Sequence, residues 1–337
     1  MSSYRVYQQT GLALDPIHVG TGGARIGRVD LTIVRDPATC VPKIPGSSLA
    51  GVYRTYVAMA EHERNPNRQV NGEPWPYYPN CAGLGQARED KEYQGHCGRN
   101  NCPVCTVFGF ARGRDASGGF AGLAAFSDAH VLLFPVPTRK GPFWITCPMA
   151  MRLIVEGFTE IDEDALHRPQ EETKPLNLGW LLLPVKALDN WDERVDRPLR
   201  DKGIPDYILR RVGVVSDKLF THIVNSNLEV RTSVAINPET GAAEEGALFS
   251  YEALPRATIL YWEIICRNPQ HFRVDGQPVV VRDSNRQATI EDIYEVVKEA
   301  HPYLEHLGIG GMGTRGMGRL RVLFSESKEE RAGEEVK

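Results

Sequence analysis

The chain has 337 residues, of which 42% are hydrophobic and 24% charged, so it can bury the core of one elaborated domain or two ordinary ones. Its formal net charge of −4 at pH 7 excludes a uniformly basic nucleic-acid binder, although a narrow basic track remains possible. No apolar run reaches the roughly 18 to 20 residues that span a bilayer, and the N-terminus lacks a signal-peptide segment, so we expect a cytoplasmic protein without a membrane partner.

The first half of the chain predicts strands around one long helix. Apolar alternation predicts a strand over residues 5–14, and apolar residues at helical spacing predict a helix over residues 46–63. Residues 120–136 and 151–158 have strand character. The acidic stretch "TEIDEDALHRPQEE" reads as an insertion.

The second half predicts a hairpin, a strand and a helix. Residues 207–227 have helical character, and residues 229–255 predict a β-hairpin that turns at Asn237 to Gly241. Residues 257–267 form a well-marked strand pattern. Residues 289–307 predict an amphipathic helix with Thr289 as its N-cap.

A cluster of cysteines in the first third of the chain predicts a metal site. Disulfides are rare in a cytosolic protein, so Cys81, Cys97, Cys102 and Cys105 are better interpreted as zinc ligands, with the last two in a CxxC knuckle. His96 is the alternative ligand in place of Cys81 or Cys97. Such a closed tetrahedral site would be structural, because it leaves no open coordination position.

The remaining cysteines stand alone in apolar surroundings. We expect Cys40, Cys147 and Cys266 to be core residues.

A glycine-rich stretch, "LGIGGMGTRGMGRLRV", contains a formal GxGxxG match at Gly311, Gly313 and Gly316. The dinucleotide fingerprint needs a strand before its glycines and a helix after them, whereas here a helix precedes and a strand follows. Open glycine backbone beside Arg315 and Arg319 can instead approach a polyanion such as a phosphodiester chain.

A second glycine-rich segment lies near the N-terminus and leads through Asp30 to the start of the long helix. Ser47 and Ser48 at that start offer hydroxyls and free backbone N–H groups to an anion. Ordinary N-capping by these serines is the alternative.

Four motifs in this order carry a family resemblance: "HVGTGGARIGRVDLTIVRDP", "VPKIPGSSLAGVYR", "CPVCTVFG" and "GGMGTRGMGRL". Together they resemble the RAMP superfamily of CRISPR effector subunits, over roughly residues 10–325. The section "VSDKLFTHIVNSNLEVRTSVAINPETGAAEEGALFSYEALP" resembles one branch, the backbone subunit of the type III-B (Cmr) complex.

The resemblance implies an α+β fold with a ferredoxin-like, RRM-like palm and inserted elements. We expect a single palm domain over residues 1–325, with a zinc-binding insertion at about 62–120 and thumb-hairpin and helical insertions at about 158–255. Residues 326–337 would form an acidic flexible tail.

The resemblance also implies partners and an activity. Subunits of this branch bind crRNA in a filament of copies of themselves with other type III effector subunits, and they cut complementary target RNA at regular intervals. The family's cutting aspartate corresponds to Asp30, which would act as a base or hold a divalent cation such as Mg²⁺. A surface ion pair with Arg28 or Arg35 is the alternative for this carboxylate.

The resemblance assigns RNA contacts to both glycine-rich regions and to the helix start, namely His18, Lys43, Ser47, Ser48, Arg54, Gly311, Gly313, Thr314, Arg315 and Gly316. We expect Glu252 to be a solvated residue of the hairpin. Two other functions remain open: a crRNA-binding scaffold in which Asp30 is idle, and a crRNA-processing endoribonuclease of the same superfamily.

Overall fold

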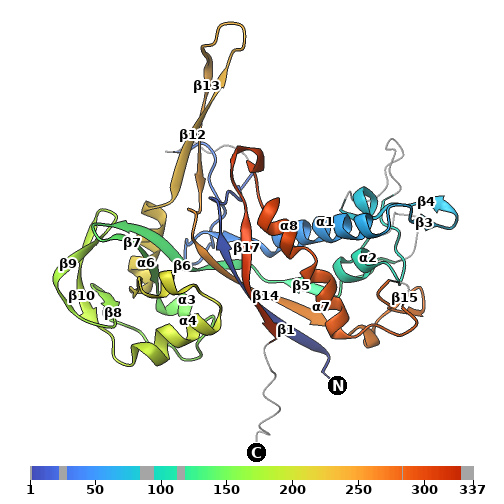
Figure 1. The fold of residues 1–337 in the computed structure, drawn as a ribbon, viewed down its shortest axis with the longest axis horizontal. Coiled ribbons are helices and arrows are strands. Elements are labelled where there is room, and N and C mark those ends of the chain that lie inside the picture. Colours follow the sequence, from blue (N-terminus) through green and yellow to red (C-terminus); the bar gives the residue numbers. More distant parts are fainter. Residues whose placement is uncertain (1, 23–28, 84–94, 112–117, 283, 328–337) are drawn as a thin grey trace, which may run out of the picture.

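An 11-stranded mixed sheet runs through the molecule, with helices packed on it and one long hairpin standing away from it (Figure 1). The structure is a computed structural model that describes residues 2–22, 29–83, 95–111, 118–282 and 284–327. Within these ranges, no helix is both long and apolar enough to span a bilayer. The last ten residues of the predicted acidic tail, 328–337, lie outside the described residues.

Four antiparallel strands form one half of this sheet in the order β17-β1-β14-β6, with β17 at the edge. Their bounds are Tyr4–Ala13 for β1, Ala129–Thr138 for β6, Ile259–Arg267 for β14 and Leu320–Ser327 for β17. The strands predicted from apolar patterning at 5–14 and 257–267 are confirmed. Trp262 of β14 is fully buried, because it faces the helical layer.

The helical layer consists of α1 (Gly46–Arg64), which follows β1, and of α7 (Ile290–Lys298) and α8 (His301–His306), which follow β14. A capping box between Thr289 and Asp292 starts α7, so the predicted N-cap is confirmed. The single helix predicted over 289–307 is wrong, because it is divided in two. Pro302 lacks an N–H and cannot continue the hydrogen-bond ladder of α7.

The other half of the sheet continues from β6 in the order β7-β11-β8-β10-β9. These strands are β7 (Gly141–Thr146), β8 (Leu166–Arg168), β9 (Glu172–Leu178), β10 (Leu181–Ala187) and β11 (Val212–Val214). The strand expected over 151–158 is wrong, because that segment follows the short helix α3 (Pro148–Met151) as turns. Its apolar side chains instead pack against a second core beside α4 (Arg197–Asp201).

The helical prediction for residues 207–227 is correct only at its ends. Helix α5 (Asp206–Leu209) is a single turn, β11 follows it, and α6 (Asp217–Ser226) begins at the N-cap Ser216. β11 is a fully buried strand of three residues, too short to show the alternation that identifies a strand from sequence.

The predicted hairpin is confirmed as β12 (Glu229–Ile236) paired with β13 (Ala243–Ala253). At its turn, the Gly241 N–H donates to the Asn237 carbonyl at 2.8 Å. The hairpin projects from the body of the molecule in Figure 1. Its exposed apolar side chains include Val230, Ile236 and Leu248.

The remaining elements are short. They are β2 (Lys43–Ile44), β3 (Gln69–Val70), β4 (Glu73–Pro74), η1 (Tyr77–Cys81), α2 (Pro103–Phe108), β5 (Ala124–Phe126), η2 (Asp192–Asp196), η3 (Pro269–His271), β15 (Arg273–Val274), β16 (Gln277–Pro278) and η4 (Gly313–Arg315). Cys147 and Cys266 are core residues as predicted, but Cys40 is exposed at a left-handed turn, so its assignment to the core is wrong.

Candidate nucleic-acid interface and metal centre

Asp30 lies at the base of the β12–β13 hairpin, beside β13. Its Oδ2 accepts hydrogen bonds from the backbone N–H and the hydroxyl of Ser250, at 2.7 and 2.9 Å. These two bonds hold the pKa of Asp30 below its ordinary value. The side chain is exposed, so a carboxylate that is ionised at neutral pH faces solvent here.

The ion pair that was the alternative for Asp30 is not formed with Arg35. Arg35 instead donates to Glu252 at 2.9 Å and to the Asn225 side chain at 2.8 Å. Arg28 lies outside the described residues. Glu252 is therefore a partly buried, paired carboxylate, and the expectation that it is solvated is wrong.

His18 is buried between the hairpin base and the C-terminal glycine-rich loop. Its Nδ1 lies 2.6 Å from the Glu252 backbone carbonyl, and a carbonyl can only accept, so Nδ1 carries a proton. Its own carbonyl accepts from the Gly311 N–H at 2.8 Å. Thus one residue joins the N-terminal segment, β13 and the glycine-rich loop.

The glycine-rich loop has a packed base and an open tip. At Gly310 (φ +88°) a Cβ would lie 2.3 Å from the His18 carbonyl oxygen, so only glycine permits this close approach. Gly313 and Gly316, in contrast, have open space where a Cβ would be, and the tip between them is exposed. The tip can therefore approach a ligand closely through its backbone.

Two of the three arginines near this loop are already neutralised. Arg319 donates from Nε and Nη2 to the two carboxylate oxygens of Asp15, and Arg321 pairs with Glu305. Arg315 makes no ion pair with any residue that the structure describes, and its guanidinium lies 5.5 Å from the centre of the Phe249 ring on β13. Arg315 is thus the cation of this loop that remains available to an anion.

The start of α1 differs from the N-capping alternative. The N-cap is Pro45, so Ser47 and Ser48 lie in the first turn, with Ser47 exposed. The Gly46 N–H donates to the Asp128 carboxylate at 2.8 Å. Lys43 pairs with the same Asp128 at 2.6 Å and with Asp36, so much of the positive charge expected at this helix start is compensated.

Arg54, which the family resemblance assigned to RNA, points towards the cysteine cluster instead. Its Nε donates to the Cys81 carbonyl at 2.8 Å, and its Nη2 donates to His96 Nδ1 at 3.0 Å. Burial and the adjacent guanidinium lower the pKa of His96 to about 4. These contacts occupy both side chains within the protein.

The four cysteines predicted as first-choice ligands come together. The Sγ atoms of Cys81, Cys97, Cys102 and Cys105 all lie within 4.8 Å of one another. The 3.7 Å between Cys97 and Cys105 is too long for a disulfide, but it matches the roughly 3.8 Å between sulfurs of a tetrahedral zinc site with Zn–S bonds of about 2.3 Å. The cluster can therefore hold a metal ion such as zinc, and His96 is outside it.

The electrostatics of the cluster fit a bound cation. Hydrogen bonds from neighbouring thiols hold the pKa of Cys97 well below its usual range, whereas burial raises the pKa of Cys102. Four thiolates would carry four negative charges in a buried space, which needs a compensating ion. Arg68, a buried residue that the sequence analysis did not select, donates to Cys97 Sγ at 3.0 Å.

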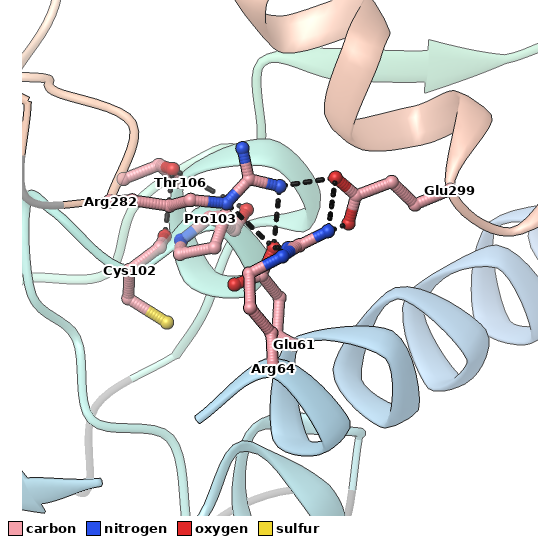
Figure 2. A network of polar contacts seen from close by, with 7 residues as sticks. All are labelled: Glu61, Arg64, Cys102, Pro103, Thr106, Arg282 and Glu299. Carbon is pink, nitrogen blue, oxygen red and sulfur yellow. Dashed lines mark hydrogen bonds and ion pairs between the residues drawn. The ribbon is translucent and has the colours of Figure 1, made fainter. Parts of the chain in front are cut away.

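A network of charged side chains holds α1 against α7 next to this cluster. In Figure 2, Arg64 and Arg282 converge on Glu61 and Glu299 beside the segment that carries Cys102. Glu61 is only 2% exposed and accepts from Arg282 Nε and Nη2 at 3.0 and 2.7 Å. The network thereby ties the C-terminal part of α1 to Arg282 and to Glu299 at the end of α7.

The contacts of three residues in these sites, Arg35, Arg68 and Ser250, could not be predicted from the spacing of residues along the sequence. Their partners are up to 220 residues away along the chain. The alternation of β13, which places Ser250 and Glu252 on one face, was the available clue.

Comparisons with known proteins agree with this architecture. The profile described as "RAMP superfamily" matches residues 12–321. The "CRISPR system Cmr endoribonuclease Cmr4" of Pyrococcus furiosus is 25% identical over 332 residues, which cover 93% of each chain.

Two solved structures share the fold across nearly the whole chain. One is "Cryo-EM structure of the Type III-B Cmr-beta bound to cognate target RNA", with TM-score 0.61, 16% identity and coverage of 96% and 99% of the two chains. The other is "Crystal structure of oligomeric Cmr4 from Pyrococcus furiosus", with TM-score 0.54, 19% identity and coverage of 96% and 98%.

Proposed function

We propose that this chain, which belongs to the RAMP superfamily, is the backbone subunit of a type III-B CRISPR ribonucleoprotein that binds crRNA and cleaves complementary target RNA. The similarity to a Cmr endoribonuclease over 93% of both chains supports the activity. The similarity to an oligomeric protein and to a complex with target RNA supports assembly as a filament with other type III subunits. The observation that carries the proposal is the exposed Asp30 at the hairpin base.

The architecture supports a ferredoxin-like, RRM-like palm. The antiparallel order β17-β1-β14-β6, with α1 after β1 and with α7 and α8 after β14, corresponds to the order 4-1-3-2 of a βαββαβ unit. The insertion at about 62–120 then contains the cysteine cluster, and that at about 158–255 contains the β12–β13 hairpin. We propose the hairpin as the thumb.

The geometry around Asp30 fits cleavage by transesterification. In this reaction the 2′-hydroxyl oxygen of one nucleotide loses its proton and forms a bond to the adjacent phosphorus, which gives a 2′,3′-cyclic phosphate. The bond from phosphorus to the 5′-oxygen breaks, and that oxygen takes up a proton from water and leaves as the 5′-hydroxyl of the downstream fragment. An in-line approach requires the RNA to leave regular A-form geometry, so positioning contributes much of the rate. Asp30 would receive the 2′ proton or orient the attacking group, and the buried His18 would position the hairpin base against the glycine-rich loop.

A divalent cation such as Mg²⁺ fits this site only together with RNA. Two hydrogen bonds from Ser250 occupy Asp30 Oδ2, which leaves Oδ1, and Glu252 is already paired with Arg35. Mg²⁺ is commonly held by one or two carboxylates plus substrate phosphate oxygens and water. We propose that Asp30 would hold such an ion with the target phosphate, where it would neutralise developing charge.

We propose that the crRNA backbone follows the exposed loop tip. The exposed tip offers the backbone of Gly313 and Thr314 and the cation of Arg315. The N–H groups of Gly311, Arg315 and Gly316 already donate to carbonyls within the chain, so the two glycines would contribute close approach rather than N–H donors. Ser47 and Ser48 extend this track at the start of α1. Their hydroxyls and the Ser47 N–H, rather than Lys43 and Arg54, would contact phosphate, because the Gly46 and Ser48 N–H groups already donate to Asp128 and to the Pro45 carbonyl.

We further propose that the cysteine cluster binds structural zinc. Four buried or half-buried sulfur ligands leave no position for substrate, which favours a structural rather than a catalytic ion.

The test compares Asp30→Asn with the wild-type chain in complexes assembled on crRNA. We expect assembly and target binding to persist. The rate at which the ladder of target fragments forms should fall by at least about 100-fold, which is the usual contribution of a positioned acid–base group. Asp36→Asn is the matched control, because asparagine also forms the turn that Asp36 forms with Ala38 and Thr39. Removal of divalent ions with EDTA should stop cleavage without releasing crRNA.

An unchanged fragment ladder in an assembled Asp30→Asn complex would contradict the catalytic assignment. The chain would then be a scaffold on which another subunit cuts. Cleavage of repeat RNA by the isolated chain would instead indicate a processing endoribonuclease.

A further inference from the structure

A hollow of about 700 Å³ lies at the base of the hairpin, on the side of α6 and of the β9–β10 turn. Its walls come from four separate segments and include Val29, Trp180, His222, Leu228, Val230 and Glu252. The volume falls within the range of roughly 300 to 1,000 Å³ that is usual for small-molecule pockets.

Trp180 is held in an exposed position by the turn on which it sits. At Gly179 (φ +63°) a Cβ would lie 2.4 Å from the Asn227 side chain, so this turn is pressed against the end of α6. The Gly179 N–H donates to the Pro137 carbonyl at 3.0 Å, which fixes the turn from the other side. Nevertheless 68% of Trp180 is exposed, and a rigidly mounted, solvent-facing indole indicates a contact surface.

His222 of α6 completes an aromatic corner with Trp180. The two ring centres are 5.4 Å apart and the ring planes meet at 78°, so the rings are not stacked on each other. The imidazole makes no hydrogen bond to any residue that the structure describes. A flat aromatic ligand can therefore stack on the indole and meet a hydrogen-bonding nitrogen of His222.

The hollow adjoins the proposed cleavage site. Val29 in its wall is the residue before Asp30, and Glu252 in its wall is held in place by Arg35. A ligand in this hollow is therefore next to the carboxylate that the proposed function requires.

We propose that the hollow is a nucleobase-binding subsite, in which Trp180 stacks on a base of the target RNA beside the cleaved linkage. This inference rests on the proposed function. A base in the hollow must leave the duplex stack, and an aromatic surface repays part of the cost of unstacking. The polar members of the lining, His222, Asn225 and Ser226, favour a base over an apolar protein segment.

The experiment uses complexes that bind target RNA without cutting it. The Asp30→Asn chain is assembled on crRNA and loaded with target RNAs that carry 2-aminopurine at one position each, across one cleavage interval. Stacking on an indole quenches this base. We expect strong quenching at a position next to the cut, its loss in the double variant with Trp180→Ala, and its retention with Trp180→Phe.

Leu182→Ala is the matched control. Leu182 lies on β10, two residues after Trp180, and is 58% exposed, but it does not line the hollow. It should leave the quenching unchanged. In chains that retain Asp30, Trp180→Ala should slow cleavage by about 5- to 150-fold, the equivalent of about 1 to 3 kcal/mol of base stacking at 25 °C. Assembly on crRNA should be unaffected.

Equal quenching at every position in the Asp30→Asn chain and in the double variant with Trp180→Ala would overturn the inference. Filament assembly that fails in Trp180→Ala, with quenching retained in the residual complexes, would overturn it as well and assign the surface to a neighbouring copy of the chain. If the Asp30→Asn complex still cuts, the same measurement uses target RNA with 2′-deoxyribose at the cut linkages, which cannot undergo transesterification, so a failure of Asp30 as the catalytic group leaves this test intact. A complex that binds no target RNA would refute both proposals.

Discussion

Replacing Glu61 with alanine should weaken the attachment of α1 to α7 beside the metal centre. Glu61 is almost completely buried, and two guanidinium groups, those of Arg64 and Arg282, donate to it (Figure 2). Without its carboxylate, both arginines keep only Glu299 as an acidic partner in the network. The substitution therefore removes the buried centre of the network and leaves its cations in place.

The magnitude follows from the exposure of the partners. Breaking a buried ion pair by removing one partner costs about 3 to 5 kcal/mol when the other charge stays buried. The side chains of Arg282 and Arg64 are 36% and 49% exposed, so both can turn towards water. We therefore expect Glu61→Ala to lower the free energy of unfolding by about 2 to 3 kcal/mol.

Two matched variants separate charge from packing. Glu61→Gln keeps the volume and one acceptor oxygen, so it should cost about 1 to 2 kcal/mol. Glu299→Ala removes the more exposed carboxylate while Glu61 still pairs with both arginines, so it should cost no more than about 1 kcal/mol.

Urea unfolding at a fixed excess of zinc measures this order, because the midpoint shifts in proportion to stability when the slope is unchanged. A Glu299→Ala midpoint below that of Glu61→Ala, or a loss under about 0.5 kcal/mol for Glu61→Ala, would refute the reasoning. Cleavage per assembled complex should not change, because the network touches neither Asp30 nor the hairpin.

Three further predictions concern the metal and the cleavage site. Cys102→Ser should reduce the zinc content of the purified chain well below one ion per chain by mass spectrometry, whereas His96→Ala should leave it at one; equal zinc in both variants would contradict the ligand set. Arg68→Gln removes the N–H donor to Cys97 and should speed zinc transfer to a chromogenic chelator by about 10- to 100-fold, and an unchanged rate would show that this contact is dispensable. The lowered pKa of Asp30 means that it protonates only below the ordinary aspartate range near pH 3.9, so cleavage between pH 5.5 and 8 should not fall through protonation of Asp30. Ser250→Ala removes one of the hydrogen bonds that lower this pKa, so an acid limb within that range that moves to higher pH in Ser250→Ala would contradict the prediction.

Local patterns were sufficient for the long elements. The apolar faces of α1 and β14 and the turn chemistry at Asn237 to Gly241 each act over a few residues, and all three predictions are confirmed. Short elements were not predictable in this way. The β11 strand is recognised through its pairing with β7 and β8, and its partners on β7 lie 68 residues earlier in the chain, as in the pair Val212 and Trp144.

The metal ligands could be predicted because their spacing is itself the constraint. A CxxC knuckle brings Cys102 and Cys105 to one point whatever the surrounding fold, and only the choice among Cys81, His96 and Cys97 needed the structure. His96 is excluded by its partner, the Arg54 guanidinium, which no spacing rule would identify.

The cations that would contact RNA were harder to predict than the metal ligands, because a basic side chain is available to a ligand only if no partner distant in sequence already pairs with it. Lys43 and Arg319 stand in basic or glycine-rich sequence, yet Asp128 and Asp15 neutralise them in the fold. Arg54 is turned inward in the same way. Of Lys43, Arg54 and Arg315, Arg315 is the one that is both exposed and without an acidic partner among the described residues.

This redistribution of charge changes how the chain would grip a polynucleotide. On the proposed track, Arg315 is the one exposed cation without an acidic partner among the described residues, so binding there cannot rest on many simultaneous phosphate contacts, whose number would set a steep dependence on salt. Backbone N–H groups at the glycine-rich tip, hydroxyls at the start of α1 and the indole of Trp180 contribute contacts that release few counterions. The affinity of one subunit for RNA should then be weak and nearly insensitive to salt, and tight binding would arise from repetition of the subunit along one strand.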